Sequence, residues 1–99
     1  MTINKKQEGS ALTIALEGRL DTMTAPELEA ELKSSLDGVS ELTVDLSDLA
    51  YISSAGLRVL LSAQKTMSKQ GSMVVCGANE DIMDIFEVTG FVDILNIQS

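Results

Sequence analysis

The chain has 99 residues, of which 44% are hydrophobic and 22% charged, as expected of one soluble domain with one core. A formal net charge of -8 and the absence of an apolar run of roughly 18 residues disfavour direct nucleic-acid binding and membrane insertion. The chain has no histidine and one cysteine, which disfavours Ser-His catalysis, zinc sites and an intramolecular disulfide. The N-terminal residues contain no signal peptide, and together with the single cysteine this favours a cytoplasmic location.

The first predicted elements are two strands. Leu12, Ile14 and Leu16 alternate with polar or small residues, which predicts a strand with one buried face. Residues 2–8 form a weaker candidate strand. Gly9 and Ser10 between them fit a two-residue hairpin turn with glycine at the first central position, so we expect the two strands to be antiparallel.

An amphipathic helix is predicted over residues 23–38. Three leucines recur one turn apart, namely Leu28, Leu32 and Leu36. Thr24 and Glu27 have the spacing of a capping box, and Met23 can close a hydrophobic staple against Leu28. Gly38 supplies the expected end of the helix.

A strand over residues 41–46 is followed by a predicted connection over residues 47–56 and then by a second helix. The expected apolar stripe of this helix consists of Leu57, Leu60, Leu61 and Met67. Its expected solvent-facing side carries Arg58, Ser62, Lys65 and Lys69. Gly71 ends the helix, and residues 72–76 form a short buried strand.

A third helix is expected after Asn79, which can cap it, with Glu80 and Asp81 at the positive end of its dipole. Its inward-facing residues are predicted to be Ile82, Ile85 and Phe86. Gly90 ends the helix, and a last strand is expected around residues 93–97.

This order of elements predicts a small α/β fold. We expect a mixed, mostly parallel sheet with right-handed crossovers, an antiparallel N-terminal hairpin and three main helices, forming one domain over residues 1–99.

The segment "YISSAGLRVLL" (residues 51–61) places two serines where a strand connects to a helix. Functional sites of open α/β sheets form at such connections. One interpretation makes Ser54 a helix cap, which contributes roughly 1 kcal/mol. The other makes Ser54 a phosphoacceptor whose phosphate is tolerated by the helix dipole and by the free amides of Ala55, Gly56 and Leu57.

Two segments resemble the bacterial anti-sigma factor antagonists, which are stand-alone STAS domains. They are "VDLSDLAYISSAGLRVLL" (residues 44–61) and "GRLDTMTAPELEAEL" (residues 18–32). The family's loop usually has the sequence Asp-Ser-Ser-Gly, with phosphorylation of the serine after the aspartate. Ser53 stands at the aspartate position, Ser54 at the phosphorylated position, Ala55 at the second serine and Gly56 at the glycine. Ser54 is therefore the expected acceptor, with Ser53 as its rival.

The resemblance implies a partner switch. The unphosphorylated protein would bind an ATP-binding anti-sigma factor serine kinase and release a sigma factor, phosphorylation would end this binding, and a phosphatase would reset the protein. The chain itself would be no enzyme and would need no cofactor or metal. The partner contacts expected around Ser54 are Asp21, Thr22, Ile52, Ser53, Gly56 and Arg58.

Other functions remain open in the sequence. A non-phosphorylated STAS module that binds a small ligand or joins a signalling complex would use Ser54 only as a cap. A phosphoaspartate switch through Asp45 or Asp48 lacks a late lysine, because the last basic residue is Lys69. Catalysis by Ser54 lacks an activating base, since Lys65 and Lys69 lie further down the helix.

Overall fold

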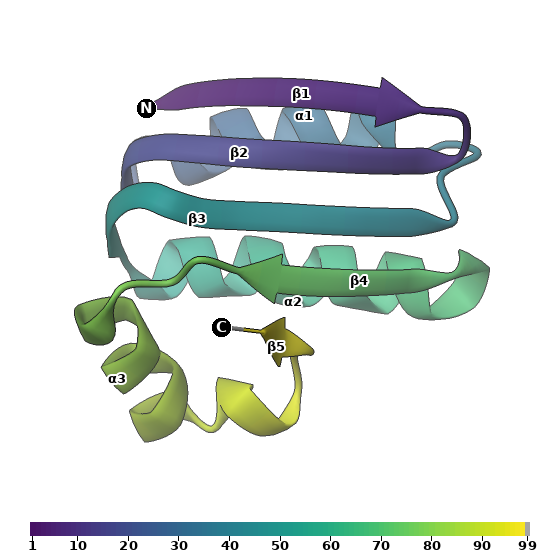
Figure 1. Cartoon of the computed structure of the whole chain (residues 1–99). Coiled ribbons are helices and arrows are strands. Elements are labelled where there is room, and N and C mark those ends of the chain that lie inside the picture. The colour runs from purple at the N-terminus through teal and green to yellow at the C-terminus, as the bar shows by residue number, and fades with distance from the viewer. Residues whose placement is uncertain (99) are drawn as a thin grey trace.

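The computed structural model describes residues 1–98 and contains one five-stranded sheet in the order β1-β2-β3-β4-β5 (Figure 1). The strands are β1 (Thr2–Glu8), β2 (Ala11–Leu20), β3 (Glu41–Ile52), β4 (Ser72–Cys76) and β5 (Ile97–Gln98). The helices are α1 (Ala25–Ser35), α2 (Ser54–Gln70) and α3 (Glu80–Thr89), with a 3-10 turn at Phe91–Asp93. β1 and β2 are antiparallel and the other pairs are parallel, which confirms the predicted fold class.

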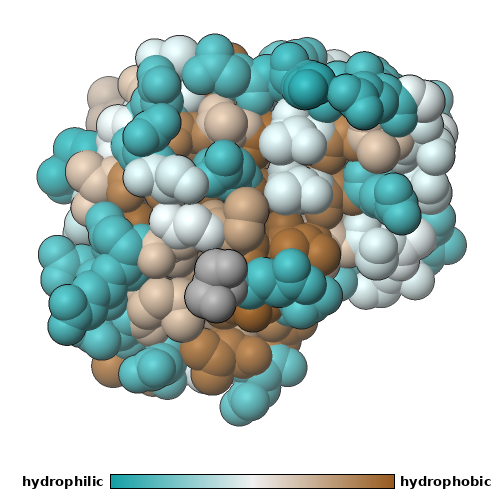
Figure 2. All heavy atoms as spheres, in the orientation of Figure 1, coloured by the Kyte–Doolittle hydropathy of each residue, from teal (hydrophilic) through white to brown (hydrophobic). Residues whose placement is uncertain are grey.

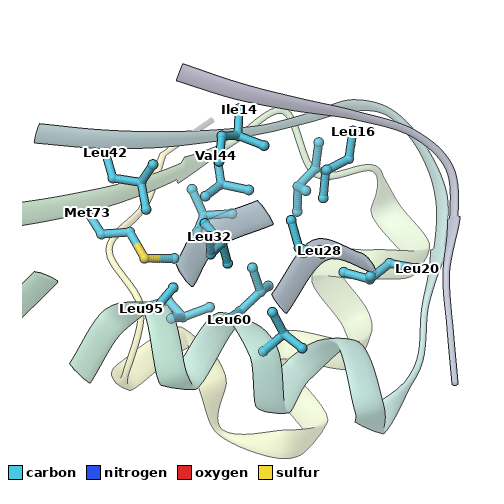
Figure 3. Packing of buried hydrophobic residues seen from close by; sticks show 14 of the residues in the cluster. Ile14, Leu16, Leu20, Leu28, Leu32, Leu42, Val44, Leu60, Met73 and Leu95 are labelled. Atoms are coloured by element: carbon cyan, nitrogen blue, oxygen red, sulfur yellow. The ribbon is translucent and has the colours of Figure 1, made fainter. Parts of the chain in front are cut away.

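The hydrophobic core lies between the sheet and the helices. Figure 1 shows α1 and α2 side by side behind the sheet, with α3 below the carboxyl end of β4. Alternate residues of β2 and β3 face the helices, and in Figure 3 Leu28 and Leu32 of α1 point toward Ile14 and Val44 of the sheet. The opposite face of the sheet carries no helix, and Figure 2 shows it as mostly hydrophilic or neutral, with apolar residues gathered toward α3 and β5.

The N-terminal hairpin forms as predicted. Glu8 pairs with Ala11, which leaves Gly9 and Ser10 as the two turn residues. Gly9 has a φ of 62°, a conformation that glycine adopts at low cost.

The start of α1 differs from the prediction. The hydroxyl of Thr24 accepts a hydrogen bond from the Asp21 amide (2.9 Å) and donates one to the Arg19 carbonyl (2.8 Å), so it caps no helical amide. The predicted capping box with Glu27 is therefore wrong. The predicted staple is also wrong, because Met23 is 87% exposed. The Asp21 carboxylate accepts hydrogen bonds from the amides of Met23 (3.0 Å) and Thr24 (3.2 Å), which lie before the helix, and so fixes the turn that leads into α1.

Strand β3 is longer than predicted and continues through residues 47–52, which the sequence assigned to a connection. The reason lies in β2, which runs to Leu20 and pairs with β3 as far as Ile52. Two register shifts in this pairing interrupt the strict alternation of buried residues. Leu46, Leu49 and Ile52 are all buried at a spacing of three, and this spacing does not match the period of two that predicts a strand. Ser53 alone connects β3 to α2.

The C-terminal half agrees with the prediction except at its end. The Asn79 side chain accepts a hydrogen bond from the Ile82 amide (2.8 Å) and caps α3, and Gly90 ends this helix with a φ of 80°. The strand expected at residues 93–97 is wrong in its bounds, because a 3-10 turn precedes it and β5 contains two residues. Within residues 1–98, no helix combines the length and apolarity that crossing a membrane requires.

Candidate functional site

The site predicted from the sequence lies where the carboxyl ends of β2 and β3 meet the first turn of α2. The Ser53 amide donates a hydrogen bond to the Leu20 carbonyl (2.9 Å) and joins the two strand ends at this point. The start of α2 is therefore held against β2, and the loop from β2 to α1 lies beside it. This is the edge of a parallel sheet at which α/β proteins place their sites.

The two serines have different positions from those expected. Ser53 is the N-cap residue of α2, whereas Ser54 is the first helical residue, so the interpretation of Ser54 as a helix cap is wrong. The Ser53 side chain makes no capping hydrogen bond, and its Oγ is buried without a hydrogen-bond partner among residues 1–98. Ser54 is exposed and Ser53 is half-buried, so Ser54 is the more accessible of the two serines.

The first turn of α2 keeps backbone donors available. The Leu57 amide donates a hydrogen bond to the Ser53 carbonyl (3.0 Å), so it is not free, contrary to the prediction. The amides of Ala55 and Gly56 have no acceptor in the described part of the chain, as is normal for the first turn of an uncapped helix. These donors and the helix dipole favour an anion beside Ser54.

Two of the expected partner contacts do not lie on the surface. Ile52 is 1% exposed, and Gly56 is buried. A Cβ atom at position 56 would lie 2.7 Å from Leu20 Cγ and 2.9 Å from Ile52 Cγ1. Only glycine allows this close approach of α2 to the strand ends, so these two residues position Ser54 rather than form a contact surface.

Asp21 is fixed in place at the end of β2. Partial burial raises the pKa of its carboxyl, but the hydrogen bonds from Thr24 and Met23 and the nearby Arg19 outweigh this effect and hold the pKa below its ordinary value of 3.8. Arg19 Nε lies 3.8 Å from Asp21 Oδ2, and the Arg19 guanidinium lies 4.5 Å from the ring centroid of Tyr51. Asp21 is thus a structured carboxylate and not a freely solvated turn residue.

Thr22 and Arg58 meet at a hollow between the start of α1 and the start of α2. This hollow has a volume of about 340 Å³ and is also lined by Ala55, next to Ser54. A second hollow of about 450 Å³ continues along the two helices and shares Glu29 and other lining residues with the first. The structure therefore brings Thr22, Arg58 and the start of α2 together.

Several residues near this site were not predicted from the sequence. Glu29 and Pro26 of α1 line the hollow, and Arg19 stacks on Tyr51 across the β2·β3 pair. The helical spacing of Pro26 and Glu29 is a signal that could have placed these two residues on one side of α1. No such local signal exists for Arg19 and Tyr51, because the register shifts decide their pairing.

Among residues 1–98, no group of three or more histidine, cysteine, aspartate or glutamate side chains is arranged to hold a metal ion. The carboxylate of Asp45, a candidate phosphoaspartate, accepts hydrogen bonds from the amide (2.9 Å) and the hydroxyl of Ser47. These hydrogen bonds lower its pKa.

Comparisons with known proteins agree with this fold and with the sequence resemblance. A family model described as "Mlab, STAS domain" matches residues 3–96. BtrV of Bordetella bronchiseptica is 39% identical over 88 residues, which cover 87% of this chain and 76% of that protein. The anti-sigma-B factor antagonist of Listeria monocytogenes is 30% identical over 96% of this chain and 85% of its own length.

Solved structures share the fold. An anti-sigma factor antagonist from Mycobacterium paratuberculosis is similar with a TM-score of 0.88 and 22% identity, over 97% of this chain and 83% of that one. Unphosphorylated SpoIIAA is similar with a TM-score of 0.77 and 13% identity, over 99% of this chain and 88% of that one. With residues 3–96 matched and relatives of this identity and coverage, the chain belongs to the STAS domain family, among the relatives of the bacterial anti-sigma factor antagonists.

Proposed function

We propose that this protein is an anti-sigma factor antagonist whose unphosphorylated form binds an anti-sigma factor serine kinase and whose phosphorylation on Ser54 ends that binding. The kinase supplies ATP and the catalytic groups, and a phosphatase returns the protein to its binding form. In this function the chain is a substrate and a binding partner and has no catalytic activity of its own. A cytoplasmic location follows from such partners.

The observation that carries this proposal is the exposed hydroxyl of Ser54 at the first helical position of α2. A hydroxyl in this position is open to a kinase, and the unoccupied amides of the first turn tolerate a phosphate there without unfolding the helix. Relatives named anti-sigma-B factor antagonists support the choice of partner. SpoIIAA, a structural neighbour, has a solved structure of its phosphorylated form, which supports the view that this fold tolerates phosphorylation.

Phosphorylation would act on the surface and leave the fold intact. A phosphoserine carries a charge of about -1.5 to -2 at neutral pH. On this chain it would be added directly after Ser53, whose amide bonds to Leu20 beside Asp21, and directly before Ala55, which lines the same hollow as Glu29. A partner that fits the uncharged surface would then lose contacts and meet repulsion at the same place.

Mass spectrometry of the protein from its native cell tests the acceptor. We expect one phosphate, mapped to Ser54, that disappears in Ser54→Ala and persists in Ser53→Ala. Ser62→Ala is the matched control, because Ser62 is another exposed serine on α2. Phosphate on Ser53 alone would move the switch by one residue, and no phosphate under any growth condition would contradict it.

Binding measurements test the partner. The purified protein is titrated against each candidate anti-sigma kinase encoded in the same genome, and Ser54→Asp is compared with Ser54→Ala. We expect the alanine variant to bind as the unphosphorylated protein does and the aspartate variant to bind at least tenfold more weakly. Equal binding by both variants would contradict the switch and favour the alternative of a STAS binding module that uses no phosphate.

A further inference from the structure

The exposed side of α2 carries basic residues that lie in line with Ser54. The helix contains cations and no acidic residue, although the net charge of the chain is -8. The cations are Arg58, Lys65 and Lys69, and all three are exposed. At 3.6 residues per turn, Ser54 and these three residues fall within about 60° of the helix circumference.

Arg58 is the cation nearest to Ser54 along this line. It follows Ser54 by four residues, a rise of about 6 Å, and side chains at this spacing are neighbours on a helix. An anion placed four residues before a cation is also the favourable order with respect to the helix dipole. Lys65 lies about 16 Å along the axis from Ser54, which is beyond direct contact.

Arg58 makes no ion pair within residues 1–98. The ion pairs of that part of the chain use Lys5, Lys6, Arg19 and Lys33. The carboxylate that lines the same hollow as Arg58 is engaged elsewhere, because Glu29 pairs with Lys33 (3.1 Å). The guanidinium of Arg58 is therefore available to a new anion at the start of α2.

We propose that Arg58 holds the phosphate of phosphorylated Ser54 within the same helix. The guanidinium can form two parallel hydrogen bonds to phosphate oxygens, which an ammonium group cannot. The modification then has two effects on the hollow between α1 and α2, because it adds negative charge and withdraws Arg58 from the surface available to a partner. This inference deepens the proposed function and rests on Ser54 as the acceptor.

The test uses full-length protein with phosphoserine incorporated at position 54 during translation, so it needs no kinase. The pKa of the phosphate is followed by phosphorus NMR in wild type, Arg58→Gln, Arg58→Lys and Lys65→Gln. Contact with Arg58 favours the dianion, so Arg58→Gln should raise the phosphate pKa by about 0.3 unit or more. Arg58→Lys should retain part of the effect, and Lys65→Gln, the matched control on the same line, should change the pKa by less than about 0.1 unit.

Two results would overturn the inference. One is an unchanged phosphate pKa in Arg58→Gln that still has the circular dichroism spectrum of the folded protein. The other is an equal rise in Arg58→Gln and Lys65→Gln, which would indicate the general field of the helix face and no contact. Absence of Ser54 phosphorylation in cells would refute the proposed function separately, since the phosphate in this experiment is already installed.

Discussion

Gly56 offers the sharpest test of how the site is positioned. A Cβ at this position would lie 2.7 Å from Leu20 Cγ, 3.0 Å from Leu20 Cδ2 and 2.9 Å from Ile52 Cγ1. Overpacking of a core costs about 1–3 kcal/mol, and contacts this short place the cost in the upper part of the range. Alanine is better than glycine in a helix by about 1 kcal/mol, which opposes that cost.

For Gly56→Ala we therefore expect a net loss of about 1–2 kcal/mol in the free energy of unfolding. In a chain of this size the loss corresponds to a decrease of about 5–15 °C in Tm. Urea and thermal denaturation followed by circular dichroism measure both quantities.

A double-mutant cycle shows whether the predicted clash is the cause. Leu20→Ala alone leaves a cavity and should cost about 2–4 kcal/mol, but it also makes room for the new Cβ. In the Leu20→Ala background the cost of Gly56→Ala should therefore fall by about 1 kcal/mol or more. A Gly56→Ala protein as stable as wild type, or more so, would refute the close packing of α2 against β2.

Three further predictions concern other parts of the chain. Asn79→Ala should lower the free energy of unfolding by about 1 kcal/mol through loss of the α3 cap, as measured by urea denaturation, and an unchanged stability would contradict the capping bond. Ser47→Ala should raise the pKa of Asp45, measured by carbon NMR, because hydrogen bonds from Ser47 hold it below 3.8. In wild type the stabilisation from this depressed pKa is complete above the unfolded-state value and is lost as the pH falls through the folded-state value, so Ser47→Ala should be less destabilising in acid than at pH 7. Burial and the Asp45 charge raise the pKa of the Cys76 thiol. This thiol should therefore be alkylated more slowly at pH 8 than the thiol of the unfolded chain, and Asp45→Asn should accelerate the reaction. Equal alkylation rates in the folded and unfolded protein would contradict this environment of Cys76.

The sequence alone determined the features that depend on neighbouring residues. The hairpin at Gly9 and Ser10, the Asn79 cap and the order of strands and helices all follow from local spacing and backbone preference. Local sequence also placed Ser54 at the start of a helix after a strand, which is the basis of the proposed switch. These features depend on interactions within a few residues, so no knowledge of distant contacts was needed.

Only the tertiary structure decided which groups at the site are exposed, buried or already hydrogen-bonded. Strand β3 extends to Ile52 because β2 supplies hydrogen-bonding partners through two register shifts, and these partners are far away in sequence. The Thr24 hydroxyl donates a hydrogen bond to the Arg19 carbonyl (2.8 Å) and does not form the predicted capping box. Gly56 and Ile52 are buried because α2 packs closely against Leu20. Each outcome depends on contacts between segments that sequence periodicity does not bring together.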